Sequence, residues 1–398
     1  MRTFSPKSQT SAHLAALDGL RGIAIALVVW YHVWQITWLR ADAHVGATTL
    51  NFNEIPEAGF IGVDLFFFIS GFVLFYPYSR ALFDGCPRPT AREFFARRAL
   101  KILPSYYLSI AVVIGLGWVH FTSLGDALAQ IASHLLFIHV LWNETYGGIN
   151  GVLWSLAVEV QFYAIFPIVA WCAMRRALPT FVTLGALGIG YRLLVVHDFD
   201  ATYQIQQLPG TIDLFAAGMA CAYVFRAIAT RAPRIAQRRT FWTIVAAIGI
   251  AASALALRGA YDTRLLPNWP NAWYVFGRTE LGLSFACVSL GSLFAYPVWQ
   301  RALANPIFTF LAFVSYNLYL YHQIIARALF AARVPEWMGP DPHSDGRWGL
   351  VFTVVAFALS LAVAWILTVT VERGIYRGLG IRVPRTPARG EHVATDPA

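Results

Sequence analysis

Long apolar stretches alternate with short polar segments along nearly the whole chain. A transmembrane helix needs about 20 consecutive, mostly apolar residues. One apolar run, 127–142, is shorter than this length. It contains His134 and His139 and could cross the membrane, re-enter it or lie at its surface. The pattern predicts an all-α integral membrane protein, a bundle of about ten transmembrane helices. The ten predicted spans are residues 17–39, 58–78, 104–121, 151–173, 178–196, 210–228, 240–257, 275–297, 306–330 and 349–371.

The basic residues of the connecting segments predict the direction in which each span crosses. Lys and Arg accumulate in cytoplasmic loops. Residues 79–103 contain six of them, whereas residues 122–150 contain none. The alternation between basic and non-basic loops is kept only if 127–142 does not cross. We therefore predict that both termini are cytoplasmic, with outer loops that include residues 40–57, 197–209 and 331–348.

The composition indicates that lipid is the main solvent of this chain. Of its 398 residues, 58% are hydrophobic and only 13% are charged, whereas a soluble domain carries about 25% charged residues. The 30 Lys and Arg against 21 Asp and Glu give a net charge of +9, which we assign to cytoplasmic loops rather than to nucleic-acid binding. The four cysteines are widely scattered and show neither disulfide nor metal spacing, so the sequence predicts no metal site.

The first apolar stretch is predicted to be a retained span and not a signal peptide. It carries Arg21 and His32 and ends without the small residues that a cleavage site needs. One membrane domain is predicted over residues 1–376, followed by a short, disordered cytoplasmic tail at 377–398. In a bacterium this architecture implies the inner (plasma) membrane.

Ionisable side chains inside the predicted spans are the main candidates for function, because a charge in lipid is costly. Arg21 and His32 share one face of the first span, since eleven residues at about 100° each return to the same direction roughly 16 Å further along the axis. Helix rise places His32, Asp64, Glu159 and His322 in one layer in the outer part of the membrane. A hydrogen bond or a cap between helices would explain Asp64 and His322 without chemistry.

A basic run at the start of the third span has two interpretations. Arg97, Arg98 and Lys101 could anchor the helix at the cytoplasmic interface. Alternatively they could bind an anionic ligand, such as the phosphates of a nucleotide-like cofactor.

Five short blocks of the chain contain most of these candidate residues. They are LDGLRG at 17–22 with His32 following, GVDLFFFISGF at 62–72, RRALKILP at 97–104, WSLAVEVQFY at 154–163 and SYNLYLYH at 315–322. Together these blocks resemble the signatures of the acyltransferase 3 family of membrane O-acyltransferases. They occur in the order found in that family and extend through most of the chain. Three positions depart from the family pattern: Lys101 stands for an arginine, Val160 for a frequent second glutamate, and Gly374 for a closing proline. Lys101 weakens bidentate phosphate binding, and Val160 leaves Glu159 as the only acid at its site.

The resemblance implies transfer of an acyl group, typically acetyl, from acyl-CoA to a hydroxyl group, usually of a sugar. A histidine can take the proton of such a hydroxyl as it attacks the thioester, so His32 is expected to be the general base, oriented by Glu159 or Asp64. An acyl-histidine intermediate is the less favoured variant. The expected acyl-CoA-binding residues are Arg21, Arg97, Arg98 and Lys101, and the expected substrate-binding residues are Trp154, Ser155 and His322.

A proton-coupled transporter is the rival function, because buried histidine and carboxylate pairs also relay protons. Symmetry between two halves of the chain would favour it, and the sequence shows none. Within the enzyme class, the acceptor could be a cell-surface polysaccharide, a glycolipid, a periplasmic glucan or a macrolide sugar. Separate partner proteins could carry the acyl group further.

Overall fold

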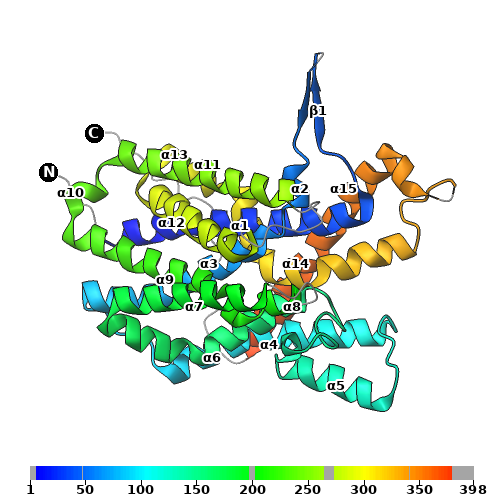
Figure 1. The fold of residues 1–398 in the computed structure, drawn as a ribbon, viewed down its shortest axis with the longest axis horizontal. Coiled ribbons are helices and arrows are strands. Elements are labelled where there is room, and N and C mark those ends of the chain that lie inside the picture. Colours follow the sequence, from blue (N-terminus) through cyan, green and yellow to red (C-terminus); the bar gives the residue numbers. More distant parts are fainter. Residues whose placement is uncertain (1–5, 47, 197–201, 264–272, 340, 379–398) are drawn as a thin grey trace.

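The computed structural model describes residues 6–46, 48–196, 202–263, 273–339 and 341–378, and long helices dominate these ranges (Figure 1). Apart from residues 377 and 378, the predicted disordered tail lies outside the described residues. Within these ranges ten long helices overlap the ten predicted spans, although the third begins at Ala91, 13 residues before the predicted start at residue 104. They are α1 (Pro6–Thr37), α3 (Ile61–Asp84), α4 (Ala91–Gly115), α6 (Leu153–Arg175), α7 (Ala177–Val195), α9 (Leu208–Arg231), α11 (Arg239–Thr263), α12 (Arg278–Phe294), α14 (Pro306–Ala331) and α15 (Gly346–Leu367).

Short elements connect these helices. The helical ones are α2 (Glu54–Glu57), α5 (Leu124–Leu135), η1 (His139–Leu141), α8 (Thr202–Ile205), α10 (Pro233–Ala236), η3 (Trp273–Gly277), α13 (Pro297–Leu303), η4 (Pro342–Ser344), η5 (Thr368–Glu372) and α16 (Arg373–Gly378). The strands β1 (Asp42–Val45) and β2 (Thr48–Asn51) form an antiparallel hairpin in which Asp42 pairs with Asn51. The sequence did not predict this hairpin, which adds a small projection to an otherwise all-α protein.

Eight of the described helices are long and apolar enough to cross a membrane. A ninth candidate combines α13 and α14, which are bent by 45° relative to each other. The protein is therefore an integral, multi-pass, all-helical membrane protein. Length and composition thus support eight or nine spans among the described residues, where the sequence predicted ten.

The difference lies in the predicted span 275–297, which corresponds to α12. This helix has only 17 residues, but the π-helical turn η3 directly precedes it. α12 packs antiparallel to α11, because Gly249 lies against Val288 and Gly291 against Ala246. Consecutive spans that cross the membrane in opposite directions pack antiparallel, so the packing of α11 and α12 is compatible with a span at α12. A tenth span at α12 stays a prediction.

The first and the ninth predicted spans run in the same direction. Gly22 of α1 lies against the backbone of Phe308 near the start of α14, so closely that a Cβ atom would collide with the carbonyl oxygen. Ten residues later in α1, His32 meets His322 of α14. Parallel packing of these helices agrees with the predicted topology, and the glycine lets their backbones approach closely.

Segments predicted on opposite sides of the membrane lie at opposite ends of the molecule. In Figure 1, α10 lies at the left-hand end, whereas α5 and the β1–β2 hairpin lie towards the right-hand end. α10 belongs to a basic, predicted cytoplasmic segment, and α5 and the hairpin belong to predicted outer loops. The arrangement is consistent with the loop-charge prediction.

The ambiguous stretch 127–142 forms α5 and η1 and does not provide a span. The 12 residues of α5 rise about 18 Å, which is short of the roughly 30 Å hydrocarbon core. His134 and His139 are buried, and their rings stack with centroids 3.9 Å apart. Burial lowers the pKa of His134 to about 4, so this imidazole is neutral near pH 7 and serves packing.

A buried ion pair joins α7 to α9. Arg192 is fully buried and donates two parallel hydrogen bonds to Asp213, from Nη1 to Oδ1 at 2.9 Å and from Nη2 to Oδ2 at 2.8 Å. Its guanidinium also donates to the carbonyl oxygens of Gly210 and Val275 and to the hydroxyl of Thr279. All three nitrogens are satisfied, which is the condition under which a buried charge is tolerated.

Candidate active site

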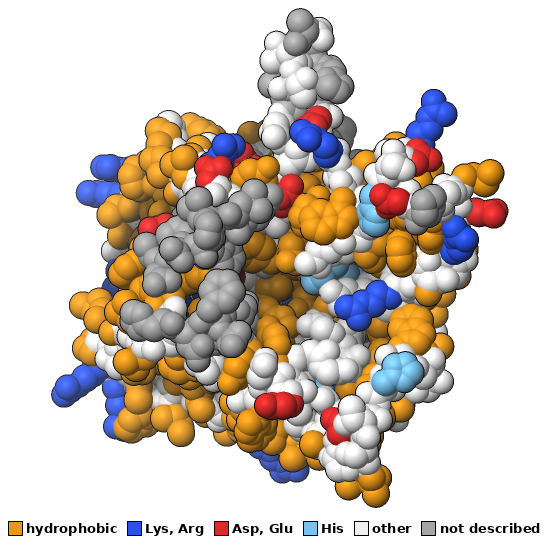
Figure 2. Space-filling view, turned by 45° about the vertical axis from the view of Figure 1, so that its right-hand side comes forward, with side chains coloured by type: hydrophobic (Ala, Val, Ile, Leu, Met, Phe, Trp, Pro, Cys, Tyr) orange, Lys and Arg blue, Asp and Glu red, His pale blue; other side chains and the backbone are white. Residues whose placement is uncertain are grey.

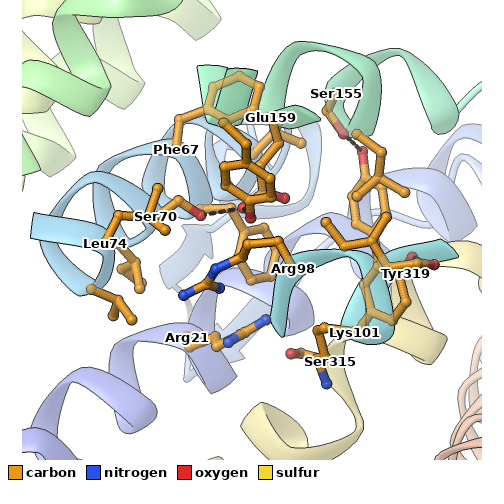
Figure 3. Close-up of a pocket in the computed structure, with 18 residues that line it drawn as sticks. Arg21, Phe67, Ser70, Leu74, Arg98, Lys101, Ser155, Glu159, Ser315 and Tyr319 are labelled. Atoms are coloured by element: carbon orange, nitrogen blue, oxygen red, sulfur yellow. Dashed lines mark hydrogen bonds between the residues drawn. The ribbon is translucent and has the colours of Figure 1, made fainter. Parts of the chain in front are cut away.

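A cavity opens between α1, α3, α4, α6 and α14 (Figure 3). It collects five residues that the sequence singled out for chemistry, namely Arg21, Arg98, Lys101, Ser155 and Glu159. The complete lining is Arg21, Val63, Phe66, Phe67, Ile69, Ser70, Val73, Leu74, Arg98, Lys101, Ile102, Ser155, Leu156, Glu159, Tyr163, Ser315, Tyr316 and Tyr319. A mostly apolar pocket with a few convergent polar groups is typical of small-molecule sites.

Three cations face one side of this cavity, and one of them is already neutralised. Lys101 forms an ion pair with Glu372, which follows α15 in the π-helical turn η5. Arg98 lies with its guanidinium carbon 5.6 Å from the centroid of the Tyr163 ring. Nε of Arg21 is buried and has no hydrogen-bond partner among the described residues. Arg21 and Arg98 are therefore better placed than Lys101 to hold an anionic ligand.

Arg97 and Trp154 lie outside the lining of the cavity. Arg97 is exposed on α4, because successive residues of a helix point about 100° apart and its neighbour Arg98 faces inward. Trp154 packs edge-to-face on the cavity residue Phe67, with ring centroids 6.1 Å apart. Trp154 thus packs behind the cavity wall, whereas Arg97 is exposed away from the lining.

Glu159 lies inside the cavity, and its contacts are not those expected from the sequence. Its Oε1 accepts hydrogen bonds from the hydroxyl of Ser70 and, at 2.6 Å, from that of Tyr163. Figure 3 shows this carboxylate directed towards Ser70. The expectation that Glu159 orients His32 finds no matching hydrogen bond among the described residues.

Asp64 has a different partner as well. Its Oδ1 lies 3.4 Å from Nε of Arg278 on α12, and both side chains are buried. Arg278 also donates to the carbonyl oxygen of Ile205 and to the side chain of Gln206. Asp64 thus helps to join α3 to α12, and its described ion pair is not with His32.

The partner of His32 is another histidine. Nδ1 of His32 lies 3.0 Å from Nε2 of His322, and the ring centroids are 4.9 Å apart. His322 is completely buried, whereas His32 is half-buried. The sequence predicted both histidines at one depth. It predicted that His322 binds the substrate, and it did not predict the contact between His322 and His32.

One face of α14 connects the histidine pair to the cavity. Ser315 and Tyr319 line the cavity, and His322 follows Tyr319 after three residues, about 4.5 Å along the axis. The centroids of the Tyr319 and His322 rings are 6.0 Å apart. The Tyr319 hydroxyl lies 2.6 Å from Oγ of Ser155, as Figure 3 shows. His322 therefore lies against a residue of the cavity wall, although neither histidine of the pair is part of the lining.

The sequence assigned no role to Ser70, Tyr163, Tyr319 or Glu372, which form hydrogen bonds or an ion pair at this site. The first three lie inside the family-like blocks, so their position was a usable signal. Their role as hydrogen-bond partners required knowledge of which helices pack together. No group of three or more His, Cys, Asp or Glu side chains in the described ranges is arranged to hold a metal ion.

The whole chain is similar to a known protein family. A family model described as an acyltransferase domain matches residues 14–369. The chain belongs to the acyltransferase 3 family. This match covers all ten long helices except the first residues of α1, and it confirms the resemblance seen in the five sequence blocks.

This acyltransferase matches different fractions of the length of its individual relatives. Nodulation protein 10 of Rhizobium leguminosarum bv. viciae is 24% identical over 387 residues, 89% of this chain and 92% of that protein. The putative peptidoglycan O-acetyltransferase YrhL of Bacillus subtilis (strain 168) is 33% identical over 174 residues, 41% of this chain and 24% of that protein. The O-acetyltransferase OatA of Staphylococcus aureus (strain NCTC 8325 / PS 47) is 28% identical over 217 residues, 49% of this chain and 31% of that protein. The chain thus matches less than a third of the length of either O-acetyltransferase. No solved structure matches the chain.

Proposed function

We propose that this acyltransferase transfers an acyl group, expected to be acetyl, from acyl-CoA to a hydroxyl group of a carbohydrate. The observation that carries the proposal is the cavity between five helices, with Arg21 and Arg98 on its wall and the His32–His322 pair next to it. The names of YrhL and OatA support O-acetylation, and that of YrhL supports a glycan acceptor.

Arginine is suited to the donor side of the reaction. Acyl-CoA is an anionic thioester, and guanidinium groups bind phosphates through paired hydrogen bonds. Arg21 lies eleven residues before His32 on α1, which corresponds to roughly 16 Å along the helix. An extended pantetheine arm entering from the cytoplasmic side would bring the thioester from the arginines towards the histidine.

His32 is proposed as the general base. Its ring takes the proton of the acceptor hydroxyl while the oxygen forms a bond to the thioester carbonyl carbon. When the carbon–sulfur bond breaks, the same proton passes to the sulfur, so that CoA leaves as a thiol. The histidine returns to its starting state, and no acyl-enzyme is required.

The acceptor is proposed to reach the site from the outer side of the membrane. His32 lies near the predicted outer end of α1, which ends at Thr37. The predicted outer segments 122–150 and 331–348 would then form the surface that a polysaccharide or glycolipid meets. Transfer across the membrane follows from this arrangement, because the donor binds from the cytoplasm.

Sealed inverted membrane vesicles test this function directly. With acetyl-CoA outside, CoA release is expected only when a glycan acceptor is enclosed in the lumen, because the lumen corresponds to the outer side. Release with external acceptor alone would contradict transfer across the membrane. Absence of release with every enclosed acceptor, together with proton uptake, would favour the proton-coupled transporter instead.

Replacing Arg98 by alanine is expected to raise the KM for acyl-CoA about tenfold or more, the effect of losing one hydrogen bond to a charged group. The kcat at saturating donor should change little, because Arg98 does not touch the reacting atoms. The matched control is Arg92→Ala, an exposed arginine on the same helix that does not line the cavity. An equal rise of KM in both variants would show that only general charge matters.

A further inference from the structure

The proton positions in the histidine pair follow from the neighbouring acceptors. Nδ1 of His322 lies 2.9 Å from the carbonyl oxygen of Leu318. A carbonyl oxygen only accepts hydrogen bonds, so Nδ1 of His322 carries the hydrogen. In its neutral form His322 therefore presents a bare Nε2, which is an acceptor, to His32.

The same reasoning fixes the state of His32. Its Nδ1 lies 2.9 Å from the carbonyl oxygen of Val28 and 3.0 Å from Nε2 of His322. Both neighbours are acceptors, so Nδ1 of His32 carries a hydrogen that the two share. The second ring nitrogen, Nε2, is then bare in the neutral imidazole, and it is the atom able to take a proton from a substrate.

We propose that His322 is a positioning residue, which holds the ring of His32 with Nε2 available to the acceptor hydroxyl and stabilises the imidazolium formed there. This inference rests on the proposed function of His32. As the hydroxyl proton moves to Nε2 and the oxygen–carbon bond forms, His32 becomes a cation whose Nδ1 hydrogen donates to Nε2 of His322. The proton then leaves with the CoA sulfur, and His322 neither gains nor loses an atom.

A neutral partner suits this place better than a carboxylate. Both carboxylates of the same layer are engaged elsewhere, Asp64 with Arg278 and Glu159 with two hydroxyl groups. An unpaired carboxylate beside a neutral histidine would be a buried charge, which is costly. A second imidazole offers a lone pair to the cation without adding a charge to the resting site.

The groups that face His32 include no anion among its described contacts. Arg327 of α14 is close enough to act on it electrostatically, and the Tyr31 ring lies edge-on with centroids 5.0 Å apart. The hydrogen bond to His322 therefore matters more here than it would beside a carboxylate.

The packing of α14 against α1 keeps the two rings together. His322 is completely buried, and its Nδ1 is tied to its own helix through Leu318. The close approach of the two helices at Gly22 and Phe308 sets the distance between them. A ring held on a packed helix can orient another at low entropic cost, because little freedom remains to be lost.

The test compares His322→Gln with His322→Leu in the full-length protein, in membranes or detergent. The glutamine amide oxygen can still accept the hydrogen bond from Nδ1 of His32, whereas leucine fills similar space without an acceptor. The leucine variant is expected to lose about tenfold to a hundredfold in kcat, as for one hydrogen bond to a charged group. Glutamine should restore most of this loss, and the KM for acyl-CoA should stay the same in both variants.

The outcomes separate this inference from the proposed function. If His322→Leu turns over like the wild type while His32→Asn does not, the positioning role is overturned and the base stands. Equal losses in the glutamine and leucine variants would also overturn the acceptor role. Should the leucine variant not fold, nitrogen NMR of isotope-labelled histidine in the wild type decides: a His32 ring protonated at Nε2 instead of Nδ1 would overturn the inference.

Discussion

His32→Asn is expected to lower kcat for acyl transfer by about 10²–10⁴-fold, the usual contribution of general acid–base catalysis. Asparagine keeps a donor near the place of Nδ1, so it can still bond to Val28 or His322. It has no basic nitrogen at the place of Nε2. The acceptor hydroxyl would then have to attack the thioester without a positioned base.

The measurement is CoA release at saturating acyl-CoA, with donor binding followed separately. Because Arg21 and Arg98 are untouched, binding of acyl-CoA should stay within about twofold of the wild type, well below one lost hydrogen bond. The matched control is Gln35→Ala, an exposed side chain one turn further along α1. A kcat for His32→Asn within a few-fold of the wild type would remove His32 from the mechanism.

The second large effect is expected on stability. Asp213→Ala would leave Arg192 fully buried without its bidentate partner, and breaking a buried pair from one side costs about 3–5 kcal/mol. The remaining bonds of Arg192 to backbone carbonyls cannot neutralise its charge. The variant should therefore unfold at a markedly lower temperature or denaturant concentration.

The double variant Arg192→Met with Asp213→Leu provides the contrast. It removes both charges and keeps apolar volume, so it should recover most of the lost stability. The exposed pair Arg258–Asp262, with side chains 55% and 50% exposed, gives the control: Asp262→Ala should cost at most about 1 kcal/mol. Unfolding in detergent, followed by tryptophan fluorescence, measures all three. Equal stability of Asp213→Ala and Asp262→Ala would contradict the expected cost.

The difference between the two carboxylates of the predicted site shows where sequence reasoning stopped. Asp64 and Glu159 were both at the right depth to orient His32, because depth follows from helix rise alone. Depth says nothing about which side of a helix faces which neighbour. Packing turned Asp64 towards Arg278 and Glu159 towards Ser70, and brought His322 to His32 instead.

Arg192, Asp213 and Arg278 show that a charged residue inside a predicted span need not belong to the active site. All three lie inside predicted spans, and a charge inside a span is a visible signal in the sequence. Their hydrogen bonds are made within a network that joins α7, α8, α9 and α12. Whether such a charge supports the fold or meets a substrate depends on its partners.

The sequence by itself determined the membrane class and the approximate positions of the helices, and the resemblance of five short blocks indicated the family. The class and the helix positions depend on apolar length and loop charge, and the family on short motifs, all of which are properties of the chain read in order. The tertiary structure alone decided that Arg98 rather than Arg97 faces the cavity and that Lys101 is paired with Glu372. It also decided that two histidines 290 residues apart share a hydrogen bond, because such contacts arise only when particular faces of particular helices pack together.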